Sequence, residues 1–319
     1  MGEDYLAIKN REVLKKTYDE NKKNVAVFVG AGGSNILGIN MWDEVLENMR
    51  KKFQPDINEI DFKEKIKCLG YAKTASEIYH STSHSEYISF MREEFRHKRA
   101  YHYSIHIKIL SIFNVIVTTN YDNTFEEALN DLEYYLKRCR CNNPLKWEIN
   151  KLEKFNHDMH EKSRPPHLVY LHCNLENDEF IFIEEEYKKH YPTYFEEDGP
   201  SKLESFLEYL LGTFSIIFIG FSFNDDIFTK FYKDTINNLI IKKEENIASE
   251  KNYEEIPPSF VFYKLKYPLE EDPDMKRLKD DLKLKVITID NYLEIEKELH
   301  KLRDIPEVKK DWGDAAFAK

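Results

Sequence analysis

The chain has 319 residues, of which 41% are hydrophobic, and a formal net charge of −11 at pH 7. This length and composition predict a folded protein of one large domain or two smaller ones, with enough apolar residues for a real core. Acidic and basic residues are interleaved and form no basic stripe, so we expect no direct nucleic-acid binding.

No targeting or membrane segment is predicted. The amino terminus has early acidic residues and neither an apolar segment nor a cleavage pattern, which argues against a signal peptide. The strongest apolar run, FSIIFIGFSF at residues 214–223, has about half of the ~20 residues that a membrane-spanning helix needs. We therefore expect a soluble, cytoplasmic protein with no membrane partner.

Six short runs rich in Val, Ile and Phe predict strands. The runs show no alternation of apolar and polar residues, which is typical of strands buried on both faces. They follow an expected N-terminal helix over residues 1–23. The runs lie at residues 24–30, 114–120, 167–172, 215–222, 259–265 and 285–290.

Helical periodicity separates most of these runs, as in residues 123–138 and 201–214. The alternation of strand and helix predicts an α/β fold with a Rossmann-like, doubly wound and mostly parallel sheet. Residues 43–113 are too many for one crossover and contain several helical stretches, so we expect an inserted helical subdomain. The polar stretch at residues 242–258 predicts a mobile loop, and residues 301–319 form an expected C-terminal tail.

Metal binding is not expected. The four cysteines are few for this length and lack the spacing of a disulfide framework. Cys139 and Cys141 form a C-x-C pair, but no second pair completes a tetrahedral zinc site. His102 and His106 lie four residues apart on a predicted helix, yet no third ligand is evident, so packing or surface roles are favoured.

A glycine-rich turn, GAGGS at residues 30–34, follows the first predicted strand. Glycine allows positive φ and exposes backbone N–H donors, and Ser34 adds a hydroxyl, so the turn could hold a pyrophosphate without a cationic side chain. The G-x-G-x-x-G fingerprint is incomplete because residue 35 is Asn, and the P-loop lysine is missing. The alternative is that the glycines only let the strand turn tightly beneath a helix.

Three other predicted strands also end in polar residues. Because the carboxyl ends of parallel strands meet at one edge of a sheet, we expect a shared ligand cleft beside the glycine turn. The polar residues are Asn120, Tyr121 and Asp122 after the second run, His172 after the third, and Ser222, Asn224 and Asp225 after the fourth.

Each of these clusters also has an ordinary structural interpretation. Asp122 with Asn123 fits the N-cap of the following helix, and Ser222 could cap a helix that begins near Asp225. His172, flanked by apolar residues, could be a buried core histidine. These interpretations do not explain why four strand ends carry four such clusters.

The segments GAGGSNILGI, TTNYD, LHCN and GFSFND resemble the sirtuin pattern in their order along the chain, over roughly residues 24–230. Sirtuins carry a G-A-G-x-S turn with a nearby G-I, an N-x-D strand end, a His-Gly catalytic turn and a G-x-S motif that meets the adenosine ribose. TTNYD, GFSF-D and FIEEEY look most like the bacterial sirtuin-like branch that hydrolyses NAD in antiphage defence. By this resemblance, residues 24–300 form an NAD-binding catalytic domain.

The resemblance implies which residues bind NAD as substrate and which act on it. The glycine turn is expected to cradle the pyrophosphate, and the G-x-S motif is expected to face the adenosine half. The expected binding residues are Gly30, Ala31, Gly32, Ser34, Thr119, Gly220, Ser222 and Asn224. The expected catalytic residues are Asn120, Asp122 and His172.

The chain departs from the sirtuin pattern in three places. Cys173 follows the histidine where the family usually has glycine, and Asn40 stands where many members have proline. The four-cysteine zinc module of deacetylating sirtuins is missing, which favours the NAD-hydrolysing branch. Cys173 also places a side chain where the family backbone path usually needs none.

Cleavage of NAD at the nicotinamide releases a group that is already cationic and leaves neutral, through an oxocarbenium-like ribose, so no general acid is required. Our hypothesis is that Asn120 positions the ribose hydroxyls and a water, Asp122 orients the nicotinamide end, and neutral His172 acts as a base. Trp42 could belong to a lid over the site, although packing at the start of a helix is the favoured interpretation.

The expected function is hydrolysis of NAD to nicotinamide and ADP-ribose, as an NAD-depleting effector of antiphage defence (abortive infection). Since uncontrolled hydrolysis would harm the cell, we expect activation by a partner or by assembly. The resemblance implies a homo-oligomer and a separate sensor or ATPase partner. The alternatives are a noncatalytic NAD or ADP-ribose sensor, and an NAD-dependent deacylase or ADP-ribosyltransferase.

Overall fold

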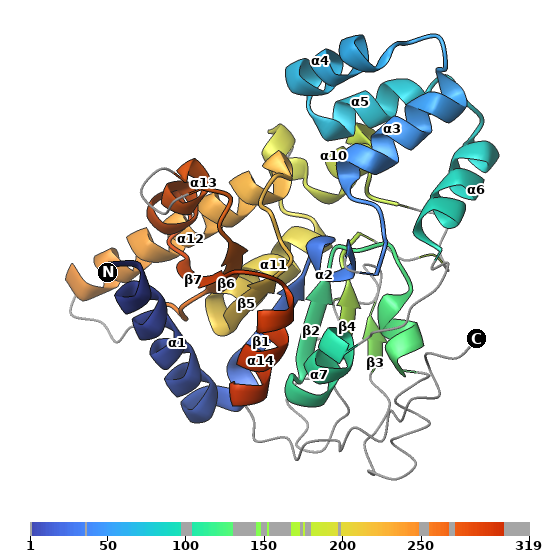
Figure 1. The fold of residues 1–319 in the computed structure, drawn as a ribbon. Helices are drawn as coiled ribbons and strands as arrows, with labels where there is room; N and C mark the ends of the chain where they lie inside the picture. The colour runs from blue at the N-terminus through green and yellow to red at the C-terminus, as the bar shows by residue number, and fades with distance from the viewer. Residues whose placement is uncertain are drawn as a thin grey trace, which may run out of the picture.

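The computed structural model describes residues 2–35, 37–96, 104–129, 145–147, 152, 167–172, 175, 180–196, 199–248, 255–267 and 272–302. Within them, a seven-stranded sheet has the order β3-β4-β2-β1-β5-β6-β7 (Figure 1). Every neighbouring pair is parallel. The predicted α/β, Rossmann-like fold with a doubly wound sheet is confirmed.

All six predicted strands are present, and the sheet has one more. The additional strand is β3, a three-residue strand that the sequence pattern did not reveal. The strands are β1 Val25–Val29, β2 Val115–Thr118, β3 Leu145–Trp147, β4 His167–Tyr170, β5 Ser215–Ile219, β6 Phe260–Lys264 and β7 Lys285–Ile289.

Helices cover both faces of this sheet. The helices of the described part include α1 Gly2–Asn21, α2 Gly32–Asn35, α3 Trp42–Phe53, α4 Glu59–Leu69, α5 Tyr71–Tyr79, α6 His84–Phe95, α7 Ser104–Ile112, α10 Glu184–His190, α11 Lys202–Thr213, α12 Asp226–Ala248, α13 Pro273–Lys276 and α14 Leu293–Leu302. Three short elements, η1 Lys22–Asn24, η3 Pro192–Phe195 and η5 Arg277–Asp281, adjoin them. None of the helices in the described part is long and apolar enough to cross a membrane.

The alternation of side chains along β1 separates two hydrophobic clusters. Ala26 and Phe28 face the cluster formed with α10, α11 and α12. Val25, Val27 and Val29 face the cluster formed with α1, α7 and α14. All five side chains are buried, which is why this strand contains no polar residue.

A third hydrophobic cluster lies beyond the carboxyl edge of the sheet, where α3, α4, α5 and α6 pack together (Figure 1). Ser83 caps α6 through a capping box with Glu86, and Asn58 caps α4 through the Asp61 amide. Helix α7, which also lies within residues 43–113, packs on the sheet and not in this cluster. The helices α3 to α6 therefore stand over the strand ends.

The prediction of a mobile loop over residues 242–258 is wrong for its first part. Residues 242–248 continue α12, which runs to Ala248. The stretch is polar because this end of the helix faces solvent, and polarity alone does not separate an exposed helix from a loop.

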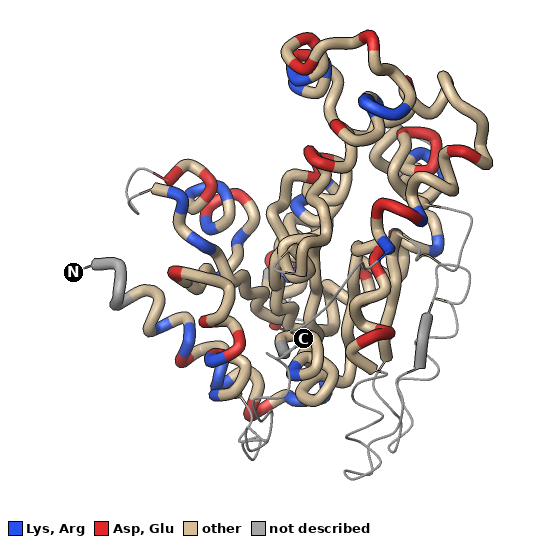
Figure 2. The backbone as a smooth tube through the Cα atoms, turned by 45° about the vertical axis from the view of Figure 1, so that its right-hand side comes forward, with Lys and Arg blue, Asp and Glu red and all other residues tan. Residues whose placement is uncertain are grey.

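Figure 2 shows acidic and basic residues interspersed over the described chain.

The turn after β1 and the loop after β5 pack backbone against backbone. The Gly30 amide donates to the Ile219 carbonyl and the Gly32 amide to the Gly220 carbonyl, each at 2.9 Å. A Cβ on Gly30 or Gly32 would lie within 2.8 Å of the Gly220 oxygen. A Cβ on Gly220 would lie 2.0 Å from the Gly33 nitrogen, and Gly220 has φ +62°. These glycines therefore allow the ends of β1 and β5 to approach each other closely. The strand order of the sheet reverses between these two strands.

Replacing Gly220 by alanine should strongly destabilise the fold, since the new methyl group meets backbone that cannot move aside. Gly199→Ala is the matched control, because Gly199 has φ +80° but open space around it. We expect Gly199→Ala to cost about 1 kcal/mol of unfolding free energy and Gly220→Ala at least about 3 kcal/mol, measured by urea denaturation. Equal losses in the two variants would show that the close contact is not required.

Candidate functional site

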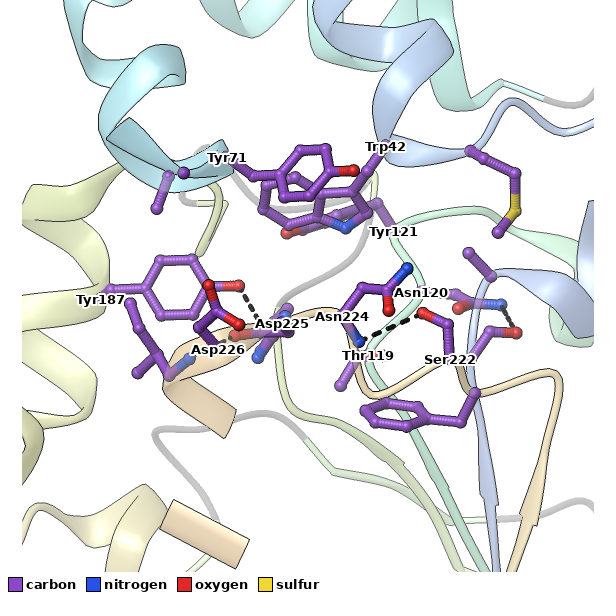
Figure 3. A pocket seen from close by; sticks show the side chains of 18 of the residues that line it. Trp42, Tyr71, Thr119, Asn120, Tyr121, Tyr187, Ser222, Asn224, Asp225 and Asp226 are labelled. Atoms are coloured by element: carbon purple, nitrogen blue, oxygen red, sulfur yellow. Dashed lines mark hydrogen bonds between the residues drawn. The ribbon is translucent and has the colours of Figure 1, made fainter. Parts of the chain in front are cut away.

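A cleft that is open to solvent lies at the carboxyl edge of the sheet. The loops after β1, β2, β4 and β5 form one side, and residues of α3 and α5 form the other. Figure 3 shows Trp42 and Tyr71 on the side opposite Asn224, Asp225 and Asp226.

The cleft brings together most of the residues expected to bind or act on NAD. Two of them, Gly32 and Ser34, lie behind its wall, where Ser34 is fully buried. Those that line it are Gly30, Ala31, Thr119, Asn120, Asp122, His172, Gly220, Ser222 and Asn224.

Asn120 is the most constrained polar side chain in the cleft. It is 6% exposed, and its Nδ2 donates to the Gly30 carbonyl at 3.2 Å and to Ser34 Oγ at 3.1 Å. Its backbone amide donates to Thr118 Oγ1 at 3.0 Å. Because a carbonyl oxygen only accepts, the nitrogen of the amide must face Gly30, and the orientation of the side chain is fixed.

The Asn120 Oδ1 atom is buried and has no hydrogen-bond partner among the described residues. An acceptor of this kind costs about 1–3 kcal/mol when it stays unpaired. Since Asn120 lines the cleft, a hydroxyl or water bound there would satisfy it. The arrangement fits a ligand that carries hydroxyl donors, such as a ribose.

The glycine turn offers fewer donors than its sequence suggests. The amides of Gly30, Gly32, Gly33 and Ser34 donate to backbone carbonyls. Among residues 30–34, the described hydrogen bonds leave only the Ala31 N–H without an acceptor. The two interpretations of the glycines are therefore not exclusive: they serve close packing, and the turn still lines the cleft.

Asp122 combines a local structural role with a position in the cleft. Its side chain is 4% exposed, and its Oδ1 accepts from the Thr124 amide at 3.0 Å, at the start of the helical residues 124–129. The capping interpretation thus holds for one oxygen of Asp122.

The cap of α12 is Asp225 and not Ser222. Asp225 accepts from the Ile227 and Phe228 amides, while Ser222 Oγ accepts from the Asn224 amide at 3.4 Å.

His172 is 2% exposed, and its Nε2 lies 3.1 Å from the hydroxyl of Tyr191. Burial, with a smaller contribution from His190, lowers the pKa of His172 to about 3. The imidazole is therefore neutral at physiological pH. A general base works best with a pKa near the working pH, so this environment favours a hydrogen-bonding role over proton removal.

Two tyrosines near α10 connect the ends of β4 and β5. Tyr187 donates to Asp225 Oδ2 at 2.7 Å, Tyr191 reaches His172, and the two phenol rings stack at 5.7 Å. Burial, with Asp226 nearby, raises the pKa of Asp225, although hydrogen bonds from Tyr187 and two amides oppose the shift. Helix α10 thus fixes two polar residues of the cleft.

The charged residues that line the cleft are mostly acidic. Lys73 of α5 is the one basic lining residue in the described part of the chain. A cleft lined mainly by negative charge attracts positively charged groups and repels phosphate groups. The acidic lining residues are Asp43, Asp122, Glu184, Asp225 and Asp226.

Several lining residues were not predicted from the sequence. Tyr71 donates to Asp43 at 2.6 Å and reaches the cleft from the helical cluster, for which no motif gave a signal. Tyr187 lies in FIEEEY, a phrase noted only for its family resemblance. Trp42, by contrast, was named from the sequence. It begins α3 and stacks on Phe182 at 4.3 Å, as the packing interpretation expects, and it also lines the cleft.

Of the histidines and cysteines considered as metal ligands, only some lie in the described part of the chain. Cys139, Cys141, Cys173 and His102 lie outside the described residues. His106 is buried and packs edge-on against Phe125 at 4.8 Å. No group of three or more potential metal ligands occurs in the described part of the chain.

Residues 114–256 match the family model of SIR2-like domains. This span includes β2, β3, β4 and β5, and therefore Asn120, His172 and Gly220 of the cleft. No curated protein matches the chain. The sirtuin-like resemblance predicted from the sequence is confirmed over these residues.

The buried neutral His172 should make stability depend on pH. An unfolded histidine binds a proton below about pH 6.5, whereas His172 in the fold does so only near pH 3, so the unfolded state gains protons first as the pH falls. Relative to His172→Gln, the wild type should lose about 1.4 kcal/mol of unfolding free energy per pH unit below pH 6.5. Parallel curves of unfolding free energy for the two proteins from pH 7 to pH 5 would contradict the burial of a neutral ring.

Proposed function

We propose that the protein is an NAD glycohydrolase, which cleaves the bond between nicotinamide and ribose with water and gives nicotinamide, ADP-ribose and a proton. The observation that carries this proposal is the buried, unpaired Oδ1 of Asn120 at the carboxyl edge of the sheet. It is an acceptor of fixed position in a SIR2-like domain, and it suits a ribose hydroxyl or an attacking water.

NAD supplies a leaving group that is already cationic, so the protein needs to hold the riboside and place a water. Asn120 accepts from a ribose hydroxyl or from the water through Oδ1, while its Nδ2 stays on Gly30 and Ser34. No reorganisation of the side chain is required on binding. This preorganisation is the main contribution that the fold makes to catalysis.

His172 and Asp122 complete the nicotinamide-ribose end. We assign His172 a neutral hydrogen-bonding role toward the ribose in place of the base role expected from the sequence, because its pKa of about 3 leaves it a weak base. Asp122 borders the positively charged nicotinamide, and its carboxylate is held by the Thr124 amide. The acidic lining of the cleft as a whole also suits a ligand with a positively charged ring.

In this proposal, the rest of the dinucleotide lies along the carboxyl ends of the strands, across the point between β1 and β5 where the strand order reverses. Gly30 and Ala31 lie against the pyrophosphate, with Gly32 and Ser34 shaping the turn behind them. Ser222 and Asn224, beside Gly220, then face the adenosine half, and Thr119 lies between the two ends. Residues 24–300 act as one catalytic domain. No metal takes part.

In the cell, the enzyme acts as an NAD-depleting effector of antiphage defence, held inactive until a partner protein or self-assembly activates it. The bacterial resemblance of TTNYD, GFSF-D and FIEEEY supports this assignment. A homo-oligomer and a separate sensor or ATPase partner belong to the same proposal. The acidic net charge and interleaved charges support a trigger other than direct binding to nucleic acid.

Asn120→Ala should abolish most of the activity while the fold persists. We expect nicotinamide release from NAD to fall at least about 100-fold in kcat, since the variant loses the acceptor that holds the reacting ribose or water. Release is measured by chromatography of the products. Asn238→Ala is the control: Asn238 lies on the exposed side of α12, away from the cleft, and should leave the rate unchanged.

Two results would contradict the proposal. A wild-type rate in Asn120→Ala would remove Asn120 from the reaction. Tight binding of NAD by the wild type, measured by calorimetry, with no release of nicotinamide in the presence of its activating partner, would instead identify a noncatalytic sensor.

A further inference from the structure

Tyr191 does not line the cleft, but it contacts the histidine that does. It follows α10 directly, is 0% exposed, and places its hydroxyl 3.1 Å from His172 Nε2. Its backbone amide donates to the Tyr187 carbonyl at 2.7 Å, and its ring stacks on that of Tyr187. The phenol is therefore held in one position.

The direction of this hydrogen bond follows from counting donors and acceptors. A buried phenol O–H needs an acceptor, and burial keeps Tyr191 protonated because it raises the pKa well above its usual value. Among the described residues, His172 Nε2 is the acceptor that this hydroxyl reaches. Tyr191 therefore donates and Nε2 accepts, which leaves the single proton of the neutral ring on Nδ1.

We propose that Tyr191 is a positioning residue that holds His172 in the Nδ1–H form, so that the histidine offers a hydrogen-bond donor to an oxygen in the cleft. His172 lines the cleft, and Nδ1 has no hydrogen-bond partner among the described residues. With Nε2 occupied by Tyr191, Nδ1 is the ring nitrogen that remains for a ligand. On the proposed function, on which this role rests, the acceptor is a ribose hydroxyl oxygen of NAD.

The surroundings of the histidine support this arrangement. The His172 carbonyl accepts from the Ile181 amide at 3.3 Å, which holds the backbone of this loop. Tyr187 packs edge-on against the imidazole at 5.6 Å and donates its own hydroxyl to Asp225, so it does not compete for Nε2. Aromatic rings thus pack against the imidazole, and among the described residues its one polar side-chain contact is Tyr191.

The test is the tautomer of His172 in the protein without NAD, read from long-range proton–nitrogen correlations of protein labelled with ¹⁵N-histidine. The His172 signals are those that disappear in His172→Gln. We expect the proton on Nδ1 in the wild type. In Tyr191→Phe, which keeps the ring and removes the donor, we expect the proton to move to Nε2 in a large fraction of molecules.

The activity of the same variants gives the functional readout. Tyr191→Phe should lower kcat for nicotinamide release about tenfold with a smaller change in KM, because NAD still binds while the donor is misplaced. Tyr209→Phe is the matched control, since Tyr209 lies on α11 outside the cleft and packs against Phe214. It should change neither the tautomer nor the rate.

A wild-type His172 with its proton on Nε2 would overturn the proposal, and this result does not depend on whether any variant folds. An unchanged tautomer in a folded Tyr191→Phe protein would overturn it as well. Because the tautomer is measured without substrate, a protein that shows the expected Nδ1–H form but no NAD hydrolysis would refute the proposed function and leave the positioning by Tyr191 intact.

Discussion

The backbone contact between the glycine turn and Gly220 sets the geometry of the whole cleft. The Gly32 amide donates to the Gly220 carbonyl, and a side chain on either partner would separate them. The same turn presents the Gly30 carbonyl, which accepts from Asn120 Nδ2. One close approach therefore joins the ends of β1 and β5 and orients the amide of Asn120, whose oxygen is then available to a ligand.

A second constraint comes from α10, which connects the loops that follow β4 and β5. Tyr191 contacts His172 after β4, and Tyr187 contacts Asp225 after β5. Burial of these groups keeps the histidine neutral and both phenols protonated. The site thus works through fixed hydrogen-bond donors and acceptors rather than through groups that gain or lose protons near neutral pH. Such a site suits a reaction whose leaving group departs without a general acid.

The sequence predicted the sheet well because the central strands are covered on both faces and cannot contain polar residues. It predicted Asn120 and His172 because polar residues that follow such strands gather at one edge. It did not predict β3, whose three residues include a lysine and form no apolar run. Nor did it predict Tyr191, nineteen residues beyond His172, since contacts between a loop and a distant helix follow no fixed spacing. The loop predicted over residues 242–258 was wrong for residues 242–248, because an exposed helix end has the composition of a loop.

The central claim is that the unpaired oxygen of Asn120 receives the ribose or the water of an NAD molecule bound along the strand ends. A crystal structure of the His172→Gln protein with NAD tests it most directly, since slow turnover should preserve the substrate. The account predicts a ribose hydroxyl or an ordered water within hydrogen-bond distance of Asn120 Oδ1, with the pyrophosphate against Gly30 and Ala31. NAD bound elsewhere, or an Asn120 Oδ1 paired with a protein group, would contradict it.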